Sequence, residues 1–291
     1  MLDQYPFKPR KFLTSFGHDM HYIDEGDGSE PPVLFLHGNP TWSYMYRKII
    51  AGLSREIRCI APDHIGCGLS QKPNLHEFPY DLQSHAQNIV SLLDHLELSK
   101  VSLVLHDWGG AIGLTALRKQ PERIHKIILL NTAAYPSRKV PRRILVCRIP
   151  VLGSLFVRGL NGFAWPATWM ATKKGLSYQT KLGFLHPYDS WSNRVAIWRF
   201  VRDIPYELTH PSRELLIETE DSLTRLGNKP IIACWGMKDF CFSSFYLNEW
   251  IRRLPKITAY RFDNAGHYVL EDAFDEINPI IHSFIIDQSG N

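Results

Sequence analysis

Short apolar runs recur along the chain, and each is bounded by residues that favour turns. The runs occupy residues 20–23, 33–37, 57–61, 101–106, 127–130, 230–235 and 258–262. Nearly continuous apolar runs of this length are typical of strands covered on both faces. From residue 33 onward most runs are separated by segments long enough for a helix, such as 82–96 and 111–120. This alternation predicts an α/β fold built on a mostly parallel sheet.

The alternation stops after Asn131 and resumes at Pro230. The residues between them are rich in tryptophan, proline and basic side chains, and segments 194–201 and 213–223 have helical patterns. We therefore expect a helical cap domain over residues 132–223, inserted after the sixth strand, and a core domain formed by residues 1–131 and 224–291. A length of 291 residues suits one large domain with such an insertion.

The composition is ordinary for a globular protein, with 44% hydrophobic and 21% charged residues. No window approaches the roughly 18 apolar residues of a membrane-spanning helix, and the first ten residues lack the apolar core of a signal peptide. The five cysteines are scattered without a Cys-x-x-Cys spacing, which argues against a disulfide framework and against a zinc site. We expect a cytoplasmic protein with reduced thiols and without a metal or organic cofactor.

The net charge of +4 is mild, but its distribution is uneven. Between Arg123 and Tyr188 there is no acidic residue, although the segment carries many lysines and arginines. Such a patch is either a solvated face or a contact surface for a membrane, an enzyme partner or a second copy of the chain. No nucleic-acid-binding motif accompanies the charge, so we expect no nucleic-acid partner.

A strand that runs into a glycine-rich turn carries the candidate nucleophile. Residues 103–110 read LVLHDWGG, which places Asp107 at the apex of the turn. A tight strand-to-helix turn of this kind exposes a nucleophile, and its glycines let the following helix pack closely. A carboxylate needs no base to remove a proton, so it can attack a carbon that bears a leaving group and form an ester. The alternative is that Asp107 only caps the helix.

Two further polar side chains follow the last two apolar runs. Asp239 ends residues 236–239 (GMKD), and His267 ends residues 263–267 (DNAGH). Because ligands gather at the carboxyl ends of parallel strands, we expect both side chains to lie near Asp107. The order along the chain resembles the nucleophile, acid and base order of the α/β-hydrolases. We predict that His267 is the base that activates water and that Asp239 orients it.

Asn39 and Trp108 flank the candidate nucleophile, and each carries a neutral side-chain N–H donor. Neutral donors can hold a departing anion such as halide without pairing with Asp107. The backbone N–H groups of the same two residues stand where this fold builds its oxyanion hole. The alternatives are that Asn39 is a turn residue before Pro40 and that Trp108 forms an aromatic wall.

With these residues in view, the chain resembles the haloalkane dehalogenases of the α/β-hydrolase superfamily over nearly its whole length. The resemblance is carried by residues 37–44 (HGNPTWSY), 63–70 (DHIGCGLS), 106–110 (HDWGG), 236–239 (GMKD) and 266–267 (GH). It implies an α/β-hydrolase fold with an eight-stranded sheet, helices on both faces and a helical cap. It also implies that Asp107 is the nucleophile, Asp239 the acid, His267 the base, and Asn39 with Trp108 the halide-binding pair.

An acid after the later strand, combined with Asn39, is similar to the third subfamily of dehalogenase-like proteins. That subfamily includes the β-lactone decarboxylases of bacterial long-chain olefin synthesis. Residues 64–68 (HIGCG), 130–134 (LNTAA) and 200–205 (FVRDIP) look like that branch. There Asp107 would attack a four-membered ring, and loss of carbon dioxide would leave an alkene. The apolar, basic cap that begins at residues 144–148 (ILVCR) suits a long-chain, lipid-like ligand, and the motifs do not separate the two reactions.

The resemblance makes haloalkane dehalogenase the first expectation. Asp107 would displace halide from a saturated carbon, and a water activated by His267 would hydrolyse the alkyl ester to an alcohol. The ligands would be a halogenated or long-chain lipophilic substrate and a halide ion, and β-lactone decarboxylase is the alternative. Epoxide hydrolases fit less well because they usually carry an aromatic residue where Asn39 stands. Epoxide hydrolases also use a pair of tyrosines from the cap, or lid, as acids, and here these would have to come from Tyr178, Tyr188 and Tyr206.

Overall fold

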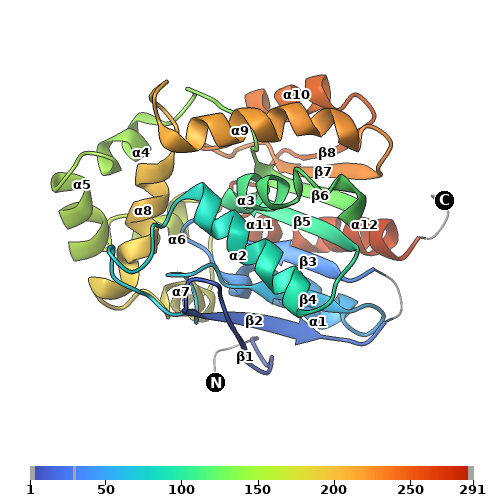
Figure 1. The fold of residues 1–291 in the computed structure, drawn as a ribbon, viewed down its shortest axis with the longest axis horizontal. Helices are drawn as coiled ribbons and strands as arrows, with labels where there is room; N and C mark the ends of the chain where they lie inside the picture. Colours follow the sequence, from blue (N-terminus) through green and yellow to red (C-terminus); the bar gives the residue numbers. More distant parts are fainter. Residues whose placement is uncertain (1–3, 29–30, 288–291) are drawn as a thin grey trace.

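The computed structural model describes residues 4–28 and 31–287 (Figure 1). Its centre is an eight-stranded sheet with the strand order β1-β2-β4-β3-β5-β6-β7-β8. β2 pairs antiparallel with β1 and β4, and all later pairs are parallel. The strands are β1 (Arg10–Leu13), β2 (Asp19–Glu25), β3 (Val33–Leu36), β4 (Cys59–Pro62), β5 (Val101–Asp107), β6 (Ile124–Thr132), β7 (Ile231–Gly236) and β8 (Thr258–Phe262). The predicted mostly parallel α/β sheet is confirmed.

Helices cover both faces of this sheet, as Figure 1 shows. Alternate residues of β5 belong to different cores: Leu103 and Leu105 pack with one set of helices, and Val104 packs with the other. The first set includes α2 (Leu82–His95), α3 (Trp108–Leu117) and α10 (Ser244–Arg253). The second includes α1 (Arg47–Leu53), α11 (Val269–Asp272) and α12 (Phe274–Ile286). Burial on both faces explains why the strands read as continuous apolar runs.

Only helices occupy the described chain between β6 and β7. They are α4 (Arg142–Cys147), α5 (Leu152–Ser154), η3 (Leu155–Gly159), α6 (Ala164–Met170), α7 (Tyr178–Leu185), η4 (Ser192–Arg194), α8 (Val195–Asp203), α9 (Pro211–Ser222) and η5 (Leu223–Leu226). We call residues 133–223 the cap segment. Its last long helix, α9, packs against α2 and α3 of the core. The division into two domains at residues 131/132 and 223/224 stays a prediction.

A buried carboxylate joins the cap segment to the core. Asp203 lies at the end of α8 and is 8% exposed. It accepts hydrogen bonds from the N–H of Leu82 at 2.8 Å and from Ser212 Oγ at 2.7 Å. One side chain therefore links α8 to the first residues of both α2 and α9. Within the described residues, no helix is long and apolar enough to cross a membrane.

Candidate active site

Asp107 lies at the sharp turn between β5 and α3, with φ 52° and ψ −122°. A non-glycine residue in this region is strained, and such strain is common where a turn exposes a nucleophile. Gly109 is required here because the carbonyl group of Leu36 lies where its Cβ would be. Thr132 Oγ1 donates a hydrogen bond of 2.5 Å to the carbonyl oxygen of Asp107. The Asp107 side chain makes no helix-capping hydrogen bond, so the capping alternative finds no support.

The structure brings the three predicted polar residues together at the carboxyl ends of the strands. His267 Nδ1 lies 2.8 Å from Asp239 Oδ2, and His267 Nε2 lies 3.8 Å from Asp107 Oδ2. The second oxygen of Asp239 accepts a hydrogen bond of 2.6 Å from the N–H of Cys241. The imidazole is thus fixed by Asp239 and stands beside the carboxylate of Asp107 at more than hydrogen-bond length. The catalytic roles of the three residues stay predictions.

Burial and charge act in opposite directions on the two central groups. Burial raises the pKa of Asp107 above its usual value, although His267 and the backbone N–H groups of Asn39 and Trp108 oppose the shift. Burial alone would lower the pKa of His267, but the charge and hydrogen bond of Asp239 outweigh it, and Asp107 adds to them. The pKa of His267 is therefore raised. If Asp107 were esterified, its negative charge would disappear and one of these supports would be lost.

Asn39 contacts the nucleophile through its backbone and the cap segment through its side chain. Its N–H donates a hydrogen bond of 2.6 Å to Asp107 Oδ1, and the N–H of Trp108 also faces that carboxylate. Both backbone groups stand where an oxyanion would form. Asn39 Nδ2 donates to the carbonyl oxygen of Ile197 in α8 at 3.1 Å. One hydrogen of the amide is engaged there, which leaves the other for a ligand.

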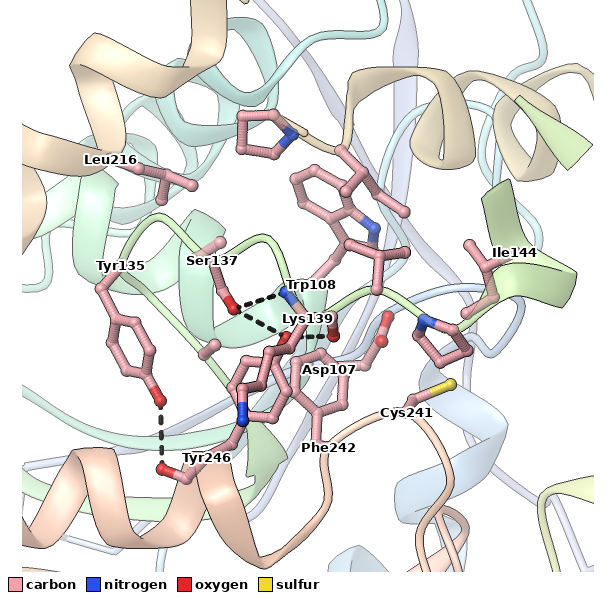
Figure 2. Close-up of a pocket in the computed structure, with 16 residues that line it drawn as sticks. Asp107, Trp108, Tyr135, Ser137, Lys139, Ile144, Leu216, Cys241, Phe242 and Tyr246 are labelled. Atoms are coloured by element: carbon pink, nitrogen blue, oxygen red, sulfur yellow. Dashed lines mark hydrogen bonds between the residues drawn. The ribbon is translucent and has the colours of Figure 1, made fainter. Parts of the chain in front are cut away.

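Two cavities meet above Asp107. The larger has a volume of about 420 Å³ and extends under the cap segment past Val146, Phe163 and Met170. The smaller has a volume of about 120 Å³ and extends past Ala133. Figure 2 shows this smaller cavity, with Asp107 and Trp108 on one side and Tyr135 and Tyr246 on the other. Residues that line both cavities are Asp107, Trp108, Ile144, Ile204 and Cys241.

The three candidate lid tyrosines do not line either cavity. Tyr178 is 72% exposed, and the buried Tyr188 donates its hydroxyl to the carbonyl oxygen of Thr41 at 3.1 Å. Tyr206 lies beneath the guanidinium group of Arg138. The acid role that the epoxide hydrolase alternative gives to these three hydroxyls therefore finds no support in the lining of the cavities.

Several residues of the site were not identified from the sequence. The ring of Phe242 stacks on the imidazole of His267, with centroids 5.8 Å apart and an interplanar angle of 17°. Cys241 orients Asp239 through its backbone, and Ile144 and Ile204 close the cavities from the cap segment. The nearness of Phe242 and Cys241 to Asp239 in the chain was the only available signal. Ile144 and Ile204 lie in segments that the sequence analysis singled out, 144–148 and 200–205, but their place in the site could not be predicted because it depends on how the helices fold over the sheet.

Comparison with known proteins agrees with this geometry. Residues 31–145 match the model of a family described as the alpha/beta hydrolase fold. The chain is 38% identical to a cis-3-alkyl-4-alkyloxetan-2-one decarboxylase of Shewanella oneidensis, over 97% of this chain and 89% of the relative. It is 32% identical to haloalkane dehalogenase 2 of Mycobacterium tuberculosis, over 94% and 93% of the two chains. A crystal structure of a haloalkane dehalogenase from Bradyrhizobium elkani has a TM-score of 0.88 at 24% identity and covers 96% of this chain and 97% of that one.

Proposed function

Because this chain belongs to the haloalkane dehalogenase family of the α/β-hydrolase superfamily, which includes the β-lactone decarboxylases, we propose that it decarboxylates a β-lactone. The substrate would be a 3,4-dialkyl oxetan-2-one, the systematic name for such a lactone, and the products an alkene and carbon dioxide. Dehalogenation, the first expectation from the sequence, is the second candidate. Two observations favour decarboxylation over dehalogenation. One is the higher identity to the decarboxylase relative, 38% against 32%. The other is the shape of the cavity.

The forked cavity carries the proposal. A 3,4-dialkyl oxetan-2-one has alkyl chains on two adjacent ring carbons, so a nucleophile that reaches the ring needs apolar space in two directions. Asp107 stands where an apolar arm of about 420 Å³ meets one of about 120 Å³. An engineered cavity of about 150 Å³ already holds benzene. A small haloalkane would therefore leave most of this space empty, whereas two alkyl chains of unequal length would fill it.

The proposed reaction has two steps. In the first, an oxygen of Asp107 attacks C4 of the ring, the C4–O bond breaks, and its electron pair becomes part of a carboxylate attached to C3. The product is an ester between C4 and Asp107. In the second, the bond from C3 to the carboxylate breaks, carbon dioxide leaves, and the electron pair forms the double bond. At the same time the bond between C4 and the Asp107 oxygen breaks, which restores the carboxylate of Asp107. The reaction therefore consumes neither water nor an oxidant.

The surrounding residues suit both steps. The carboxylate released in the first step would meet the neutral donors Asn39 and Trp108, which hold it less strongly than a cation would. A weakly stabilised carboxylate in an apolar cavity loses carbon dioxide more readily than one in a salt bridge. The pKa of His267 is raised by Asp239 and Asp107, which favours a charged imidazole at this position. While Asp107 is esterified, the C3 carboxylate of the intermediate keeps a negative charge in the cavity, and a positive charge on His267 would stabilise the returning carboxylate in the second step.

Dehalogenation is favoured by one specific observation, the pair of neutral donors beside Asp107. Asn39 and Trp108 line the larger cavity with Asp107, and their side-chain N–H groups would receive a halide as readily as a carboxylate. The ester that forms would lack the C3 carboxylate, so it could leave Asp107 only by hydrolysis. Esterification would remove a negative charge from beside His267, lower its pKa and prepare it to take a proton from water.

Oxygen labelling separates the two reactions. The enzyme would turn over a cis-3,4-dialkyl oxetan-2-one in H₂¹⁸O, and mass spectrometry of the peptide that contains Asp107 would follow the label. We expect an alkene, carbon dioxide and no ¹⁸O in Asp107, because each step returns the original oxygen. Inversion at C4 followed by anti loss of carbon dioxide also predicts the cis alkene.

The same enzyme with 1-bromooctane is the matched control, since the attack of Asp107 releases bromide and the later hydrolysis of the ester releases octanol and leaves ¹⁸O in Asp107. A lactone product that is a hydroxy acid, together with ¹⁸O in Asp107, would reject decarboxylation. Fast bromide release without alkene formation from any lactone would make the protein a dehalogenase.

A further inference from the structure

The cap segment exposes much of the apolar surface of the protein in one short stretch. Nine of the eighteen large hydrophobic side chains that are exposed in the described residues lie between residues 146 and 169. The most exposed are Val151 at 70%, Leu152 at 65% and Leu160 at 76%. We call residues 146–160 the cap tip. Figure 1 shows α5 of the cap tip at the outer left edge of the molecule.

The cap tip is apolar on both of its faces. Gly153 and Val157 face the protein and are buried, whereas Leu152 and Leu155 are 65% and 52% exposed on the outer side. A helix of a water-exposed surface normally places polar residues there. Clustered apolar side chains at an exposed surface mark a contact with something apolar.

Basic residues without acidic neighbours in the chain flank the cap tip. No Asp or Glu occurs between Arg123 and Tyr188. Arg142, Lys173 and Lys174 are exposed, and none of the ion pairs among the described residues involves them. Arg148 of the tip is paired with Glu207 at 2.6 Å, but the cap segment as a whole carries an excess of positive charge, which is complementary to an anionic surface.

The cap tip also borders the entrance of the larger cavity. Val146 and Phe156 belong to the tip and are 58% and 43% exposed, yet both line the cavity that ends at Asp107. Whatever apolar phase covers the tip is thus continuous with the interior of the cavity. A long-chain molecule could pass between them without crossing water.

We infer that the cap tip inserts into the headgroup region of a bilayer that contains anionic lipids. The tip exposes leucine, valine and phenylalanine side chains, and the exposed Trp165 and Trp169 follow it in α6. Such side chains beside basic residues are the composition of surfaces that bind at a membrane interface. A second copy of this chain is a poorer partner, because symmetric pairing would bring the same basic residues against each other. The inference rests on the surface alone and holds for either reaction at Asp107.

Vesicle co-sedimentation tests this inference. The intact protein is mixed with phosphatidylcholine vesicles, or with vesicles that also contain phosphatidylglycerol. We expect binding to the anionic vesicles that weakens as salt is added. The double variant Leu152→Ser/Leu155→Ser should reduce the partition coefficient at least about tenfold. The triple variant Arg142→Gln/Lys173→Gln/Lys174→Gln should reduce it about fivefold for each charge removed.

Matched controls remove equally exposed residues elsewhere. Leu13→Ser/Leu75→Ser and Lys100→Gln/Lys119→Gln should bind as the original protein does, and circular dichroism verifies that every variant is folded. Failure of the original protein to bind anionic vesicles, or equal losses in tip and control variants, overturns the inference. So does concentration-dependent dimerisation in sedimentation velocity that the leucine variant abolishes without vesicle binding, because a second copy would then cover the tip. Turnover is not measured, so a wrong reaction assignment leaves the result unaffected.

Discussion

Replacement of His267 by glutamine distinguishes an electrostatic role of the imidazole from activation of water. In the proposed decarboxylation no water is consumed, so the variant should still complete turnovers, only more slowly. In a dehalogenation the same change should stop the enzyme after one turnover, because the alkyl ester on Asp107 can no longer be hydrolysed. Glutamine keeps a polar side chain of similar length, which limits the damage to packing against Phe242.

The expected loss follows from the distance between the two groups. A charged imidazole 3.8 Å from Asp107 Oδ2 interacts with the carboxylate by about 4 kcal/mol at an effective dielectric constant near 20. If all of this stabilisation were present when the carboxylate returns and none in the ester, the second step would slow about a thousandfold. Partial charge at the transition state lowers that figure, so about a thousandfold is the upper bound.

The assay counts products per active site. Gas chromatography measures alkene from the lactone over hours, and intact-protein mass spectrometry measures any ester on Asp107. We expect more than one alkene per site from His267→Gln, and with 1-bromooctane a single equivalent of bromide and a stable adduct. If the lactone reaction also stops once each active site has reacted with one lactone, with an adduct that persists on Asp107, the electrostatic role is refuted. That result would show that His267 must activate water for both substrates.

Four further outcomes are expected. Asp107→Asn should abolish alkene and bromide formation, since an amide is a poor nucleophile; full activity in a purified variant would remove the assignment. Ala133→Leu, which fills the smaller arm, should raise KM for a 3,4-dialkyl lactone but leave 1-bromooctane unaffected, and an equal effect on both would argue against the fork. Burial raises the pKa of Asp203 to about 7, so this group stabilises the fold below pH 4 and that contribution is lost as pH rises through 7. In urea unfolding, the free energy of unfolding of the original protein should therefore fall by up to about 4 kcal/mol more between pH 4 and 8 than that of Asp203→Asn. The same pH dependence in both proteins would contradict the raised pKa. Gly109→Ala should destabilise the protein by at least about 1 kcal/mol, because its Cβ meets the Leu36 carbonyl; unchanged thermal unfolding would contradict that contact.

The parallel strands were predictable because both of their faces are buried. Strand β1 was not identified as an apolar run, since Phe12 is its only buried residue and the other positions are exposed. Strand β6 extends to Thr132, one residue beyond the expected boundary, where polar side chains replace the apolar run. Helix α3 begins at Trp108, three residues before the start expected from its apolar pattern. Local hydrophobicity therefore located the centres of the buried strands and of α3, but not their ends, where tertiary contacts decide.

The positions of Asp107, Asp239 and His267 followed from the same logic, because Asp107 ends a parallel strand and the other two come shortly after one. The sheet order then places β5, β6, β7 and β8 side by side, which no local pattern states. The fork of the cavity was beyond prediction. It depends on which faces of α4, α6 and α8 meet the sheet. α4 and α6 show no clear apolar stripe, and the apolar stripe of α8 does not state which element it packs against.

The side-chain amide of Asn39 is tethered to the carbonyl oxygen of Ile197, a residue 158 positions further along the chain. The direction of a donor beside the reacting carbon is thus set by a helix of another part of the molecule. A chimera that grafts the 133–223 region of a relative onto this core would re-aim that amide even if every residue of the core were kept. Divergence among members of this family could then tune leaving-group preference without any change next to the nucleophile.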